Sequence, residues 1–390
     1  MTATRTDRPG CLACVVGARP NYMKMAPLVR AFAARPDLPP VTLIHTGQHY
    51  DVAMNERLFR DLELPPPDLN LEVGSGTHAV QTAEIMRRFE PVVDELAPSA
   101  VIVVGDVNST LACTLVAVKK GIPVVHVEGG LRSRDRTMPE EINRVLTDQV
   151  ADVLYTTEKE AAENLVREGV DAARIAFVGN VMIDSLLRHR PRAVAPSVTL
   201  ARAGHDVDLV ARGFGTVTLH RPSNVDTPAA LSEALTILRD AAARLPLVWP
   251  VHPRTRANIE RFSLGHMISD APIMLLEPQG YLEMLGLLAE ARVVLTDSGG
   301  IQEETTALGV PCLTLRENTE RPITVAQGTN TVVGLSRSRV LACLDEVMKS
   351  GGKRGRVPEL WDGHAAPRIA AHLAHWLVAH APTERRVRVA

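Results

Sequence analysis

Residues 293–304 read VVLTDSGGIQEE, an apolar run that breaks at two glycines and continues in a helical pattern. A short apolar run of this kind is typical of a buried parallel strand. The first N–H groups of the helix that follows have no partners within it, and the helix dipole adds partial positive charge there. Two glycines let an anion approach this backbone without a Cβ in the way. Ser298, Gly299 and Gly300 are therefore a candidate phosphate site, and the alternative is an ordinary strand-to-helix connection.

Two acidic residues, Glu303 and Glu304, stand in the first turn of this predicted helix. Their carboxylates would repel a phosphate if they pointed at it. A position beside the phosphate, hydrogen-bonded to hydroxyl groups such as those of a ribose, fits them better. The alternative is that acidic residues simply favour the start of a helix.

The composition is that of a globular protein with two domains. The chain has 390 residues, of which 45% are hydrophobic and 23% are charged, and this is enough for two hydrophobic cores. The formal net charge is −2 and no basic block lies inside the chain, so we expect no nucleic acid partner. The first ten residues lack an apolar segment, and no apolar run is long enough to span a membrane. These absences predict a cytoplasmic protein without membrane contact.

The chain contains one C-x-x-C pair, Cys11 and Cys14, within an apolar run that reads as the first strand. A redox pair usually stands at the start of a helix, and a zinc site would need a second pair of ligands, which is missing. We therefore expect both cysteines to be core residues of a strand, and we expect no metal site here.

Apolar runs alternate with helical patterns along the whole chain and fall into two series. The runs lie at residues 12–16, 41–44, 100–104, 123–127 and 175–178, and then at 216–219, 247–251, 273–276, 293–296 and 312–315. This alternation predicts an α/β protein with two doubly wound domains, each a parallel sheet covered by helices on both faces. The join is expected between residues 181 and about 213. Ligands of such sheets bind beyond the carboxyl ends of the strands, so the site is expected in the cleft between the domains.

Charged residues follow several strands of the first domain. Arg19 and Lys24 come after the first strand and could meet phosphates, although the G-x-G-x-x-G spacing of a dinucleotide site is absent. Asp106 and Glu128 stand at the ends of two later strands, with Arg132 as the expected ion-pair partner of Glu128. Alternatively, Arg19 and Lys24 are solvated surface charges, and Asp106 is a helix cap.

Glu140 lies in a helix start led by a proline, where a second acid follows it. Acids in a first turn are favoured by the helix dipole, so a capping role competes with a chemical one.

The second domain offers His220 and His252 after its first two strands, and Arg321 near the candidate phosphate site. A histidine at a strand end can bind phosphate and protonate a leaving group. Phosphate held by one domain and acid–base carboxylates supplied by the other is the layout expected for chemistry on a nucleotide sugar. Spacing alone leaves glycosyl transfer and epimerisation both open.

In this order, these clusters closely resemble the non-hydrolysing UDP-N-acetylglucosamine 2-epimerases. The matching stretches are residues 17–24, 46–49, 105–106, 126–133, 139–144, 179–180, 218–224, 295–304 and 319–322. The match covers about residues 12 to 380. It implies two Rossmann-like domains in a GT-B arrangement, at residues 11–183 and 184–365. A disordered tail at 1–10 is expected before them, and a helix at 366–390, with a tail, is expected to return to the first domain.

The resemblance implies reversible conversion of UDP-GlcNAc to UDP-ManNAc. The C2 proton is removed as UDP leaves, a bound 2-acetamidoglucal forms, and UDP re-adds with the proton delivered to the other face. No redox cofactor and no metal are needed, and a homodimer is expected. The C2 proton is only weakly acidic, so its loss must accompany the departure of UDP, and acid–base groups are needed near both faces of C2.

The resemblance also assigns roles by position. Asp106, Glu128 and Glu140 match the acid–base carboxylates, without a decision on which serves which face, and His220 matches the group at the sugar–phosphate oxygen. The residues that match substrate contacts are Arg19, Lys24, Arg144, His252 and Arg321, then Ser298, Gly299 and Gly300 as the phosphate site, Glu304 as the ribose ligand and Met284 on the uracil side.

Some members of the family bind a second UDP-GlcNAc that activates them. Gln48 and His49 match part of that second site, but Tyr50 and Asp51 replace an Arg and a Gln that are common among the regulated members. This departure argues against activation of this kind.

Three alternatives remain beside the non-hydrolysing epimerase. A hydrolysing 2-epimerase would release free ManNAc and UDP. A GT-B glycosyltransferase would need an acceptor groove and fewer carboxylates in its first domain. A UDP-sugar sensor would bind the nucleotide sugar without forming any product.

Overall fold

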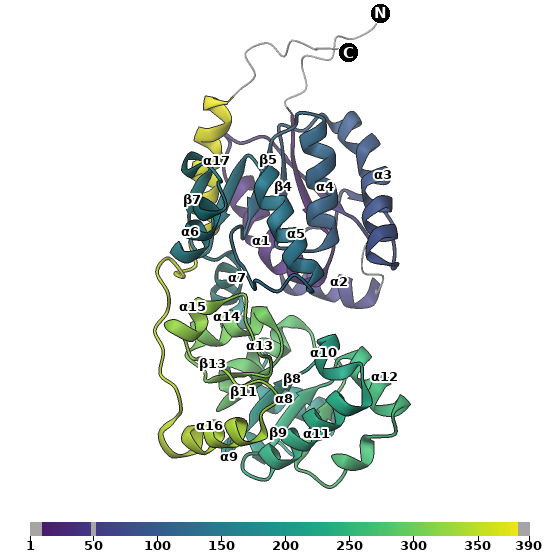
Figure 1. Ribbon diagram of the computed structural model, residues 1–390, viewed down its shortest axis with the longest axis vertical. Coiled ribbons are helices and arrows are strands. Elements are labelled where there is room, and N and C mark those ends of the chain that lie inside the picture. The colour runs from purple at the N-terminus through teal and green to yellow at the C-terminus, as the bar shows by residue number, and fades with distance from the viewer. Residues whose placement is uncertain (1–9, 48–51, 381–390) are drawn as a thin grey trace, which may run out of the picture.

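The computed structural model describes residues 10–47 and 52–380, and within them it forms two parallel β-sheets. In spatial order the first sheet consists of β3 (Leu69–Asn70), β2 (Val41–His45), β1 (Leu12–Val16), β4 (Ala100–Val104), β5 (Val124–Val127), β6 (Val153–Thr156) and β7 (Ile175–Phe177). The second consists of β10 (Ile273–Leu276), β9 (Leu247–Pro250), β8 (Gly215–Thr218), β11 (Val293–Thr296), β12 (Cys312–Thr314) and β13 (Asn330–Val332). The predicted α/β class with two doubly wound units is confirmed (Figure 1).

Helices connect the strands of both sheets and cover their faces. Those of the first part are α1 (Arg19–Ala33), α2 (Val52–Asp61), α3 (His78–Leu96), α4 (Asn108–Lys119), α5 (Pro139–Val150), α6 (Lys159–Arg167) and α7 (Val181–His189). The second part has α8 (Pro196–Arg202), α9 (Asp208–Arg212), α10 (Pro222–Val225), α11 (Pro228–Ala242), α12 (Pro253–Arg261), α13 (Tyr281–Glu290), α14 (Gly299–Leu308), α15 (Pro322–Ala326) and α16 (Arg337–Ser350). The last helix is α17 (Ala365–Ala379).

All ten apolar runs singled out in the sequence form strands, with ends that differ by at most one residue. The sequence reading missed β3, β6 and β13. The first of these has only two residues, and the last begins with an asparagine. The segments that form β3 and β13 contain too few apolar residues to indicate a strand, and pairing with a neighbouring strand decides their structure. This explanation does not cover β6, which reads VLYT.

The first sheet is buried between helices, and its core includes the two cysteines that were predicted to be core residues of a strand. Cys11 and Cys14 are buried free thiols, as expected for core residues of a strand. Burial raises the pKa of the Cys14 thiol well above its ordinary value, with a smaller contribution from Cys11. The Cys14 thiol is therefore a packing group at neutral pH.

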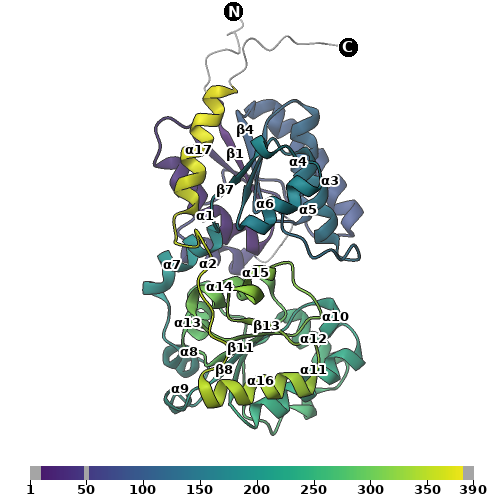
Figure 2. The same cartoon turned by 60° about the vertical axis from the view of Figure 1, so that its left-hand side comes forward.

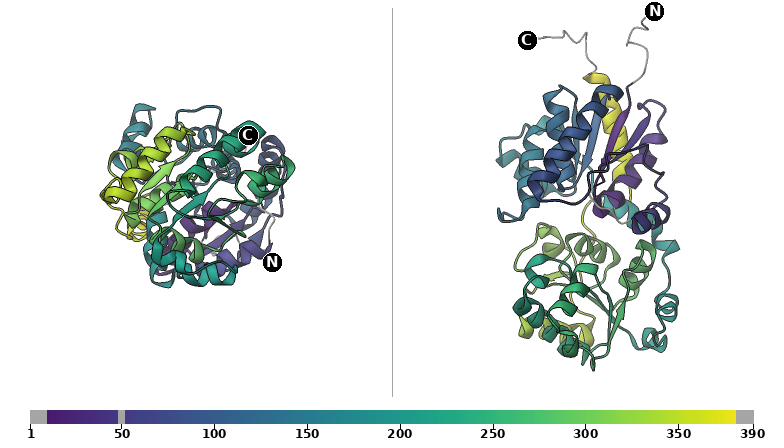
Figure 3. Two further views of the ribbon diagram at one scale, coloured as in Figure 1. Left: turned by 90° about the horizontal axis from the view of Figure 1, so that it is seen from below. Right: turned by 90° about the vertical axis from the view of Figure 1, so that its right-hand side faces the viewer.

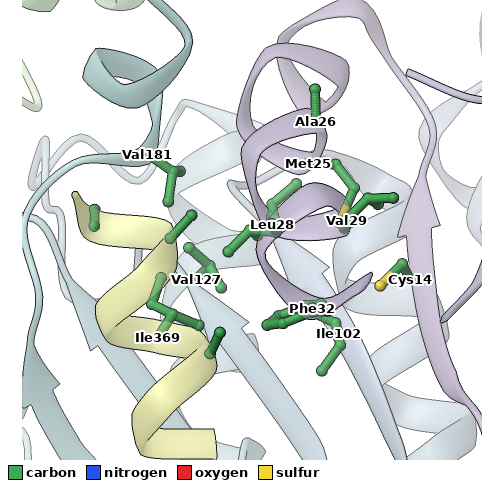
Figure 4. Packing of buried hydrophobic residues seen from close by; sticks show 14 of the residues in the cluster. Cys14, Met25, Ala26, Leu28, Val29, Phe32, Ile102, Val127, Val181 and Ile369 are labelled. Atoms are coloured by element: carbon green, nitrogen blue, oxygen red, sulfur yellow. The ribbon is translucent and has the colours of Figure 1, made fainter. Parts of the chain in front are cut away.

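The C-terminal helix α17 packs against α1 of the first part. Figure 4 shows Ile369 of α17 facing the same core as Leu28 and Phe32 of α1 and Val127 of β5. In Figures 1 and 2 the chain leaves α16 and runs back along the second part to reach this helix, drawn in yellow. The first core is therefore completed by a segment from the far end of the chain.

The chain crosses between the two bodies at α7 and at the segment before α17, and Figure 3 shows both bodies from two further sides. Asp184 of α7 accepts the N–H groups of Ala365 and Ala366 at 3.0 and 2.7 Å. Trp361 Nε1 donates to the Thr157 carbonyl at 3.0 Å. The Asp184 bonds tie the two crossings together, and the Trp361 bond fixes the second crossing to the end of β6. The predicted boundary after residue 183 falls within α7 and stays a prediction.

Residues 1–9 of the predicted N-terminal tail lie outside the described part of the chain. Within the described residues, no helix combines the length and the apolar character needed to cross a bilayer.

Replacing Ile369 with alanine tests the packing of α17. Ile369 is 0% exposed, and loss of a buried isoleucine side chain typically costs about 2–5 kcal/mol. We expect I369A to lower the free energy of unfolding by this amount in urea titrations followed by circular dichroism. Val378 lies in the same helix but is 78% exposed, so V378A should leave the urea midpoint unchanged. Equal effects of the two substitutions would contradict the packing described.

Candidate active site

Arg321 lies at the centre of a buried cluster of charges between the two sheets. Its Nη2 is 2.8 Å from Glu128 Oε1 of the first part, its Nε is 3.0 Å from Glu303 Oε2, and its Nη1 is 2.9 Å from Glu320 Oε1. Burial acts to lower the pKa of Arg321, but the three carboxylates outweigh burial and hold it well above its ordinary value. A buried guanidinium needs such partners, because an unpaired charge removed from water is very unfavourable.

Glu128 stands directly after β5, where the backbone turns through a left-handed conformation with φ 73°. Its N–H donates to the Tyr155 carbonyl of the neighbouring strand at 3.0 Å. One carboxylate oxygen contacts Arg321, and the other contacts the ammonium group of Lys24. The carboxylate is thus held between Lys24 of α1 in the first part of the chain and Arg321, at the start of α15, in the second.

The predicted pairing of Glu128 with Arg132 is wrong. Arg132 instead contacts Asp148 Oδ2 at 2.7 Å and Glu168 Oε2 at 2.6 Å. The left-handed residues Glu128 and Gly130 turn the chain twice between the two side chains. The arginine is therefore directed toward α5 and the end of α6, behind the carboxylate that faces the second sheet.

Asp106 follows β4 and lies beside Arg144 of α5. The Arg144 Nε and Nη2 atoms are each 3.0 Å from Asp106 Oδ2, and Arg144 also pairs with Glu141 one turn earlier. Burial acts to raise the pKa of Asp106, but the positive charges of Arg144, Lys24 and Arg321 outweigh it and lower the pKa. Asp106 is therefore an anion at neutral pH.

Glu140, at the start of α5, faces the second part of the chain. Its Oε1 is 3.5 Å from Arg221 Nη1, and the other terminal nitrogen of Arg221 is 3.7 Å from Glu320 Oε1. Glu320 also pairs with Arg316 at 2.8 Å. Burial alone would raise the pKa of Glu320, but Arg321, Arg316 and the other arginines hold it well below the usual range.

His220, after β8, is oriented by the buried carboxylate of Asp297. The His220 Nδ1 is 2.9 Å from Asp297 Oδ1, and Asp297 also accepts the N–H groups of His220 and Arg221. Burial acts to raise the pKa of Asp297, but these bonds and the imidazole outweigh it and lower the pKa. Because Nδ1 is engaged, Nε2 is the nitrogen available for proton transfer.

His252 lies next to His220, with ring centroids 5.6 Å apart. Burial, followed by the charges of His220 and Arg19, lowers the pKa of His252 to about 4. The imidazole is therefore neutral at pH 7.

The start of α14 carries the predicted phosphate site, and Ser298 is its N-cap residue. A Cβ at Gly299 would lie 2.6 Å from Glu320 Oε1 and 2.9 Å from Arg321 Nη1, so a side chain there would displace the central arginine. Gly300 has more room. The first of the two glycines is thus required by the charge cluster itself.

Glu304 and Met284 lie on the second sheet's side, away from the central arginine. Burial raises the pKa of Glu304 to about 7, with a further contribution from the charge of Glu303 and a smaller opposing effect of the Tyr281 hydroxyl. Met284 of α13 is partly buried against an apolar cluster of the second part. A packing role for Met284 is therefore evident.

The structure describes all of the predicted site residues except two. Gln48 and His49 lie outside the described residues. The sequence pattern gave no role to Asp297, Asn180 or Glu320, although Asp297 directly follows a predicted strand and Glu320 adjoins Arg321. Asn180 Nδ2 donates to Glu303 Oε1 at 2.9 Å, a contact that only the folded chain reveals.

A metal site finds no support in the described part of the chain. No group of three or more His, Cys, Asp or Glu side chains is placed there to share a metal ion.

Two parallel-sheet domains with carboxylates of one facing cations of the other are the layout expected for chemistry on a nucleotide sugar. Comparison with known proteins identifies the class. Residues 30–374 match the family model described as UDP-N-acetylglucosamine 2-epimerase. The chain is 38% identical over 373 residues to the UDP-N-acetylglucosamine 2-epimerase of Methanocaldococcus jannaschii, covering 93% of this chain and 99% of that one. It therefore belongs to the UDP-N-acetylglucosamine 2-epimerase family and is a nucleotide-sugar 2-epimerase, an isomerase.

Two further comparisons bear on the fold and the substrate. The crystal structure of the M. jannaschii enzyme in complex with UDP-GlcNAc and UDP matches with a TM-score of 0.83 at 37% identity, covering 94% of this chain and 99% of that one. The UDP-2,3-diacetamido-2,3-dideoxy-D-glucuronate 2-epimerase of Pseudomonas aeruginosa is 39% identical over 367 residues, which are 92% of this chain and 98% of the relative. The GT-B arrangement is thus confirmed, and the sugar remains to be assigned.

Replacing Arg321 with methionine should destabilise the protein strongly, because three buried carboxylates lose a shared partner. Removing one member of a buried ion pair typically costs about 3–5 kcal/mol. Arg337 pairs with Asp240 at the surface, where its side chain is 63% exposed, so R337M should cost at most about 1 kcal/mol. Thermal and urea unfolding of both variants measures the difference.

The loss in R321M should shrink as the pH falls from 8 to 5. Without the guanidinium, burial raises the pKa of the remaining carboxyl groups above their unfolded values. The folded variant then binds protons that the unfolded chain does not, so its stability rises as pH falls through those pKa values. A destabilisation that is independent of pH would contradict this electrostatic explanation.

Proposed function

We propose that the protein interconverts UDP-GlcNAc and UDP-ManNAc by inversion at C2. The observation that supports this most directly is the meeting of two kinds of group in one cleft. Asp106, Glu128 and Glu140 come from the first domain, and His220 and Arg321 come from the second. A site of this kind, with acid–base groups from one domain and cations from the other, suits chemistry on a nucleotide sugar.

The first step removes the C2 proton and expels UDP. The electron pair of the C2–H bond forms the C1–C2 double bond of a 2-acetamidoglucal, and the bond from C1 to the phosphate oxygen breaks. A carboxylate accepts the proton. Asp106, an anion held by Arg144, and Glu128, held by Lys24 and Arg321, are both suited to this role. UDP then re-adds to C1 while a second carboxyl group delivers a proton to the opposite face of C2.

The departing diphosphate needs positive charge and a proton donor. Arg19, Lys24, Arg144, His252 and Arg321 are the proposed contacts, with Ser298, Gly299 and Gly300 at the start of α14. His220, oriented by Asp297 at 2.9 Å, is proposed to protonate the oxygen that leaves C1. Glu304 is proposed to bind the ribose, and Met284 to contact the uracil.

A modified UDP-HexNAc is the second candidate substrate. The Pseudomonas relative is named for a diacetamido glucuronate and matches this chain as closely as the M. jannaschii enzyme does. Both sugars carry an N-acetylamino group on C2, and both reactions invert that carbon, so the same carboxylates would serve either.

The homodimer remains a prediction.

Incubating the enzyme with UDP-GlcNAc in D2O and following proton NMR tests the reaction. We expect UDP-ManNAc to appear with deuterium at C2, because the proton on the second carboxyl group comes from solvent. UDP-2,3-diacetamido-2,3-dideoxy-glucuronate is tested in parallel. Turnover of that sugar alone would assign the second candidate. Free ManNAc with UDP would show hydrolysis instead, and binding without product would show a sensor.

Substituting the carboxylates one at a time tests their roles. D106N and E128Q should each lower kcat by about 10²–10⁴-fold, the usual contribution of an acid–base group, with a smaller change in KM. Asp94 is 60% exposed and pairs with Lys120 on the surface, so D94N should keep the wild-type rate. Retention of kcat by both cleft variants would exclude them from proton transfer.

A further inference from the structure

The proposed reaction creates a proton imbalance within the cleft. Inversion at C2 with two carboxyl groups leaves one of them with an extra proton and the other without one. The next turnover in the same direction requires both to return to their starting states. While nucleotide and sugar fill the cleft, water reaches these carboxyl groups poorly. The inference below therefore rests on the proposed function and concerns how the protons are exchanged.

Glu158 is a buried carboxyl group to which the mechanism above gives no role. It follows β6 and is 1% exposed. It is the N-cap residue of α6, but its side chain makes no capping hydrogen bond. Thr157 Oγ1 donates to Glu158 Oε2 at 2.9 Å, and the described part of the chain provides no ion-pair partner for it. Neither helix capping nor charge pairing therefore explains a buried carboxyl group at this position.

A small cavity of about 110 Å³ lies between α6 and α15, with Glu158 in its wall. Phe177, Ile323 and Gln327 also line it, and Lys159 and Glu359 stand at the domain junction there, paired at 2.7 Å. These last two side chains are 66% and 60% exposed, so the cavity borders on solvent. Its volume admits several water molecules, and its wall offers polar partners for them.

Glu158 shares the cavity wall with Ile323 and Ala326 of α15, the helix that begins directly after Arg321 of the central charge cluster. The negative charge of Glu303 and the positive charge of Arg321 both act on it. Glu303 and Glu128 are bound by the same side of the Arg321 guanidinium, through Nε at 3.0 Å and Nη2 at 2.8 Å. Their carboxyl groups are therefore neighbours. Glu158 thus borders the cavity, and Glu303 shares the guanidinium of Arg321 with the carboxylate proposed to act at C2.

We propose that Glu158 and Glu303 connect Glu128 with the solvent-bordered cavity and exchange its proton without passage through the substrate site. A proton on Glu128 moves to Glu303 as Glu303 gives its own to Glu158, and Glu158 releases one to cavity water. The reverse sequence reloads Glu128. Each step breaks one O–H bond and forms another, so no other reactant is needed.

The charges around these acids suit proton exchange near neutral pH. Burial, then the charge of Glu303, raises the pKa of Glu158 to about 8, while Thr157 and Arg321 oppose this. Burial also raises the pKa of Glu303 although Arg321 opposes it, and the charge of Glu128 contributes. Glu160 adds to the negative charge from α6. An acid with a pKa close to the ambient pH is the most effective at both accepting and releasing protons.

The variant E158Q separates proton exchange from the chemical step. Glutamine has the shape of the protonated acid but cannot transfer a proton between its two ends. We expect a rate close to wild type in a single turnover with enzyme in excess, since the resting enzyme has already equilibrated with solvent. In the steady state kcat should fall by roughly tenfold or more, because each turnover then waits for slow exchange. Glu160 lines the same cavity from an exposed position, so E160Q is the matched control and should resemble wild type in both measurements.

Two other outcomes would overturn the proposal. Equal losses in single-turnover and steady-state rates would show that Glu158 supports the fold or the chemical step. Unchanged rates in both would show that exchange takes another route. A wild-type enzyme without turnover would instead contradict the proposed function. Infrared difference spectra between pH 7 and 9.5 need no substrate: a protonated carboxyl band that E158Q removes is expected, and its absence in the wild type would also overturn the proposal.

Discussion

The ion pairs of Arg321 with three carboxylates are the interaction on which the remaining site geometry depends. One guanidinium contacts Glu128 of the first domain and Glu303 and Glu320 of the second. Its planar shape requires these carboxylates to lie in fixed directions around it. Gly299 follows from the same constraint, since a Cβ there would lie 2.9 Å from the arginine. These contacts therefore hold the start of α14 close to the end of β5.

The ends of the strands were predictable from the sequence, but the pairing of their charges was not. Apolar runs followed by polar clusters place Asp106, Glu128 and His220 at the carboxyl edges of parallel sheets, because strand direction is the same throughout each sheet. Which cation meets which carboxylate depends on turns. The left-handed turn at Glu128 directs its carboxylate away from Arg132 and toward Lys24. The pattern of apolar and polar residues does not predict such a turn.

Helix geometry explains a second limit of the sequence reading. Glu303 and Glu304 are adjacent acids that the sequence pattern treats alike. Their predicted place in the first turn is wrong, because α14 begins at Gly299 and its first turn holds no acid. Successive residues of an α-helix point about 100° apart, so the two carboxyl groups face different surroundings. Glu303 meets Arg321 and Asn180, and Glu304 lies near Tyr281. Only the packing of α14 between the cluster and α13 decides which of them belongs to the charge network.

The carboxyl groups of the cleft divide into two classes by their surroundings. Asp106 is kept anionic by nearby cations that outweigh its burial, and this suits a proton acceptor. Glu158, Glu303 and Glu304 are buried with too little positive charge to offset desolvation, so their pKa values rise. Environments that push the pKa values of neighbouring acids apart are the usual basis for dividing proton acceptors from proton donors. The positive charge of Arg144, Lys24 and Arg321 thus outweighs burial at Asp106, whereas burial prevails at Glu158, Glu303 and Glu304, and carboxyl groups in one region therefore differ in the direction of their pKa shifts.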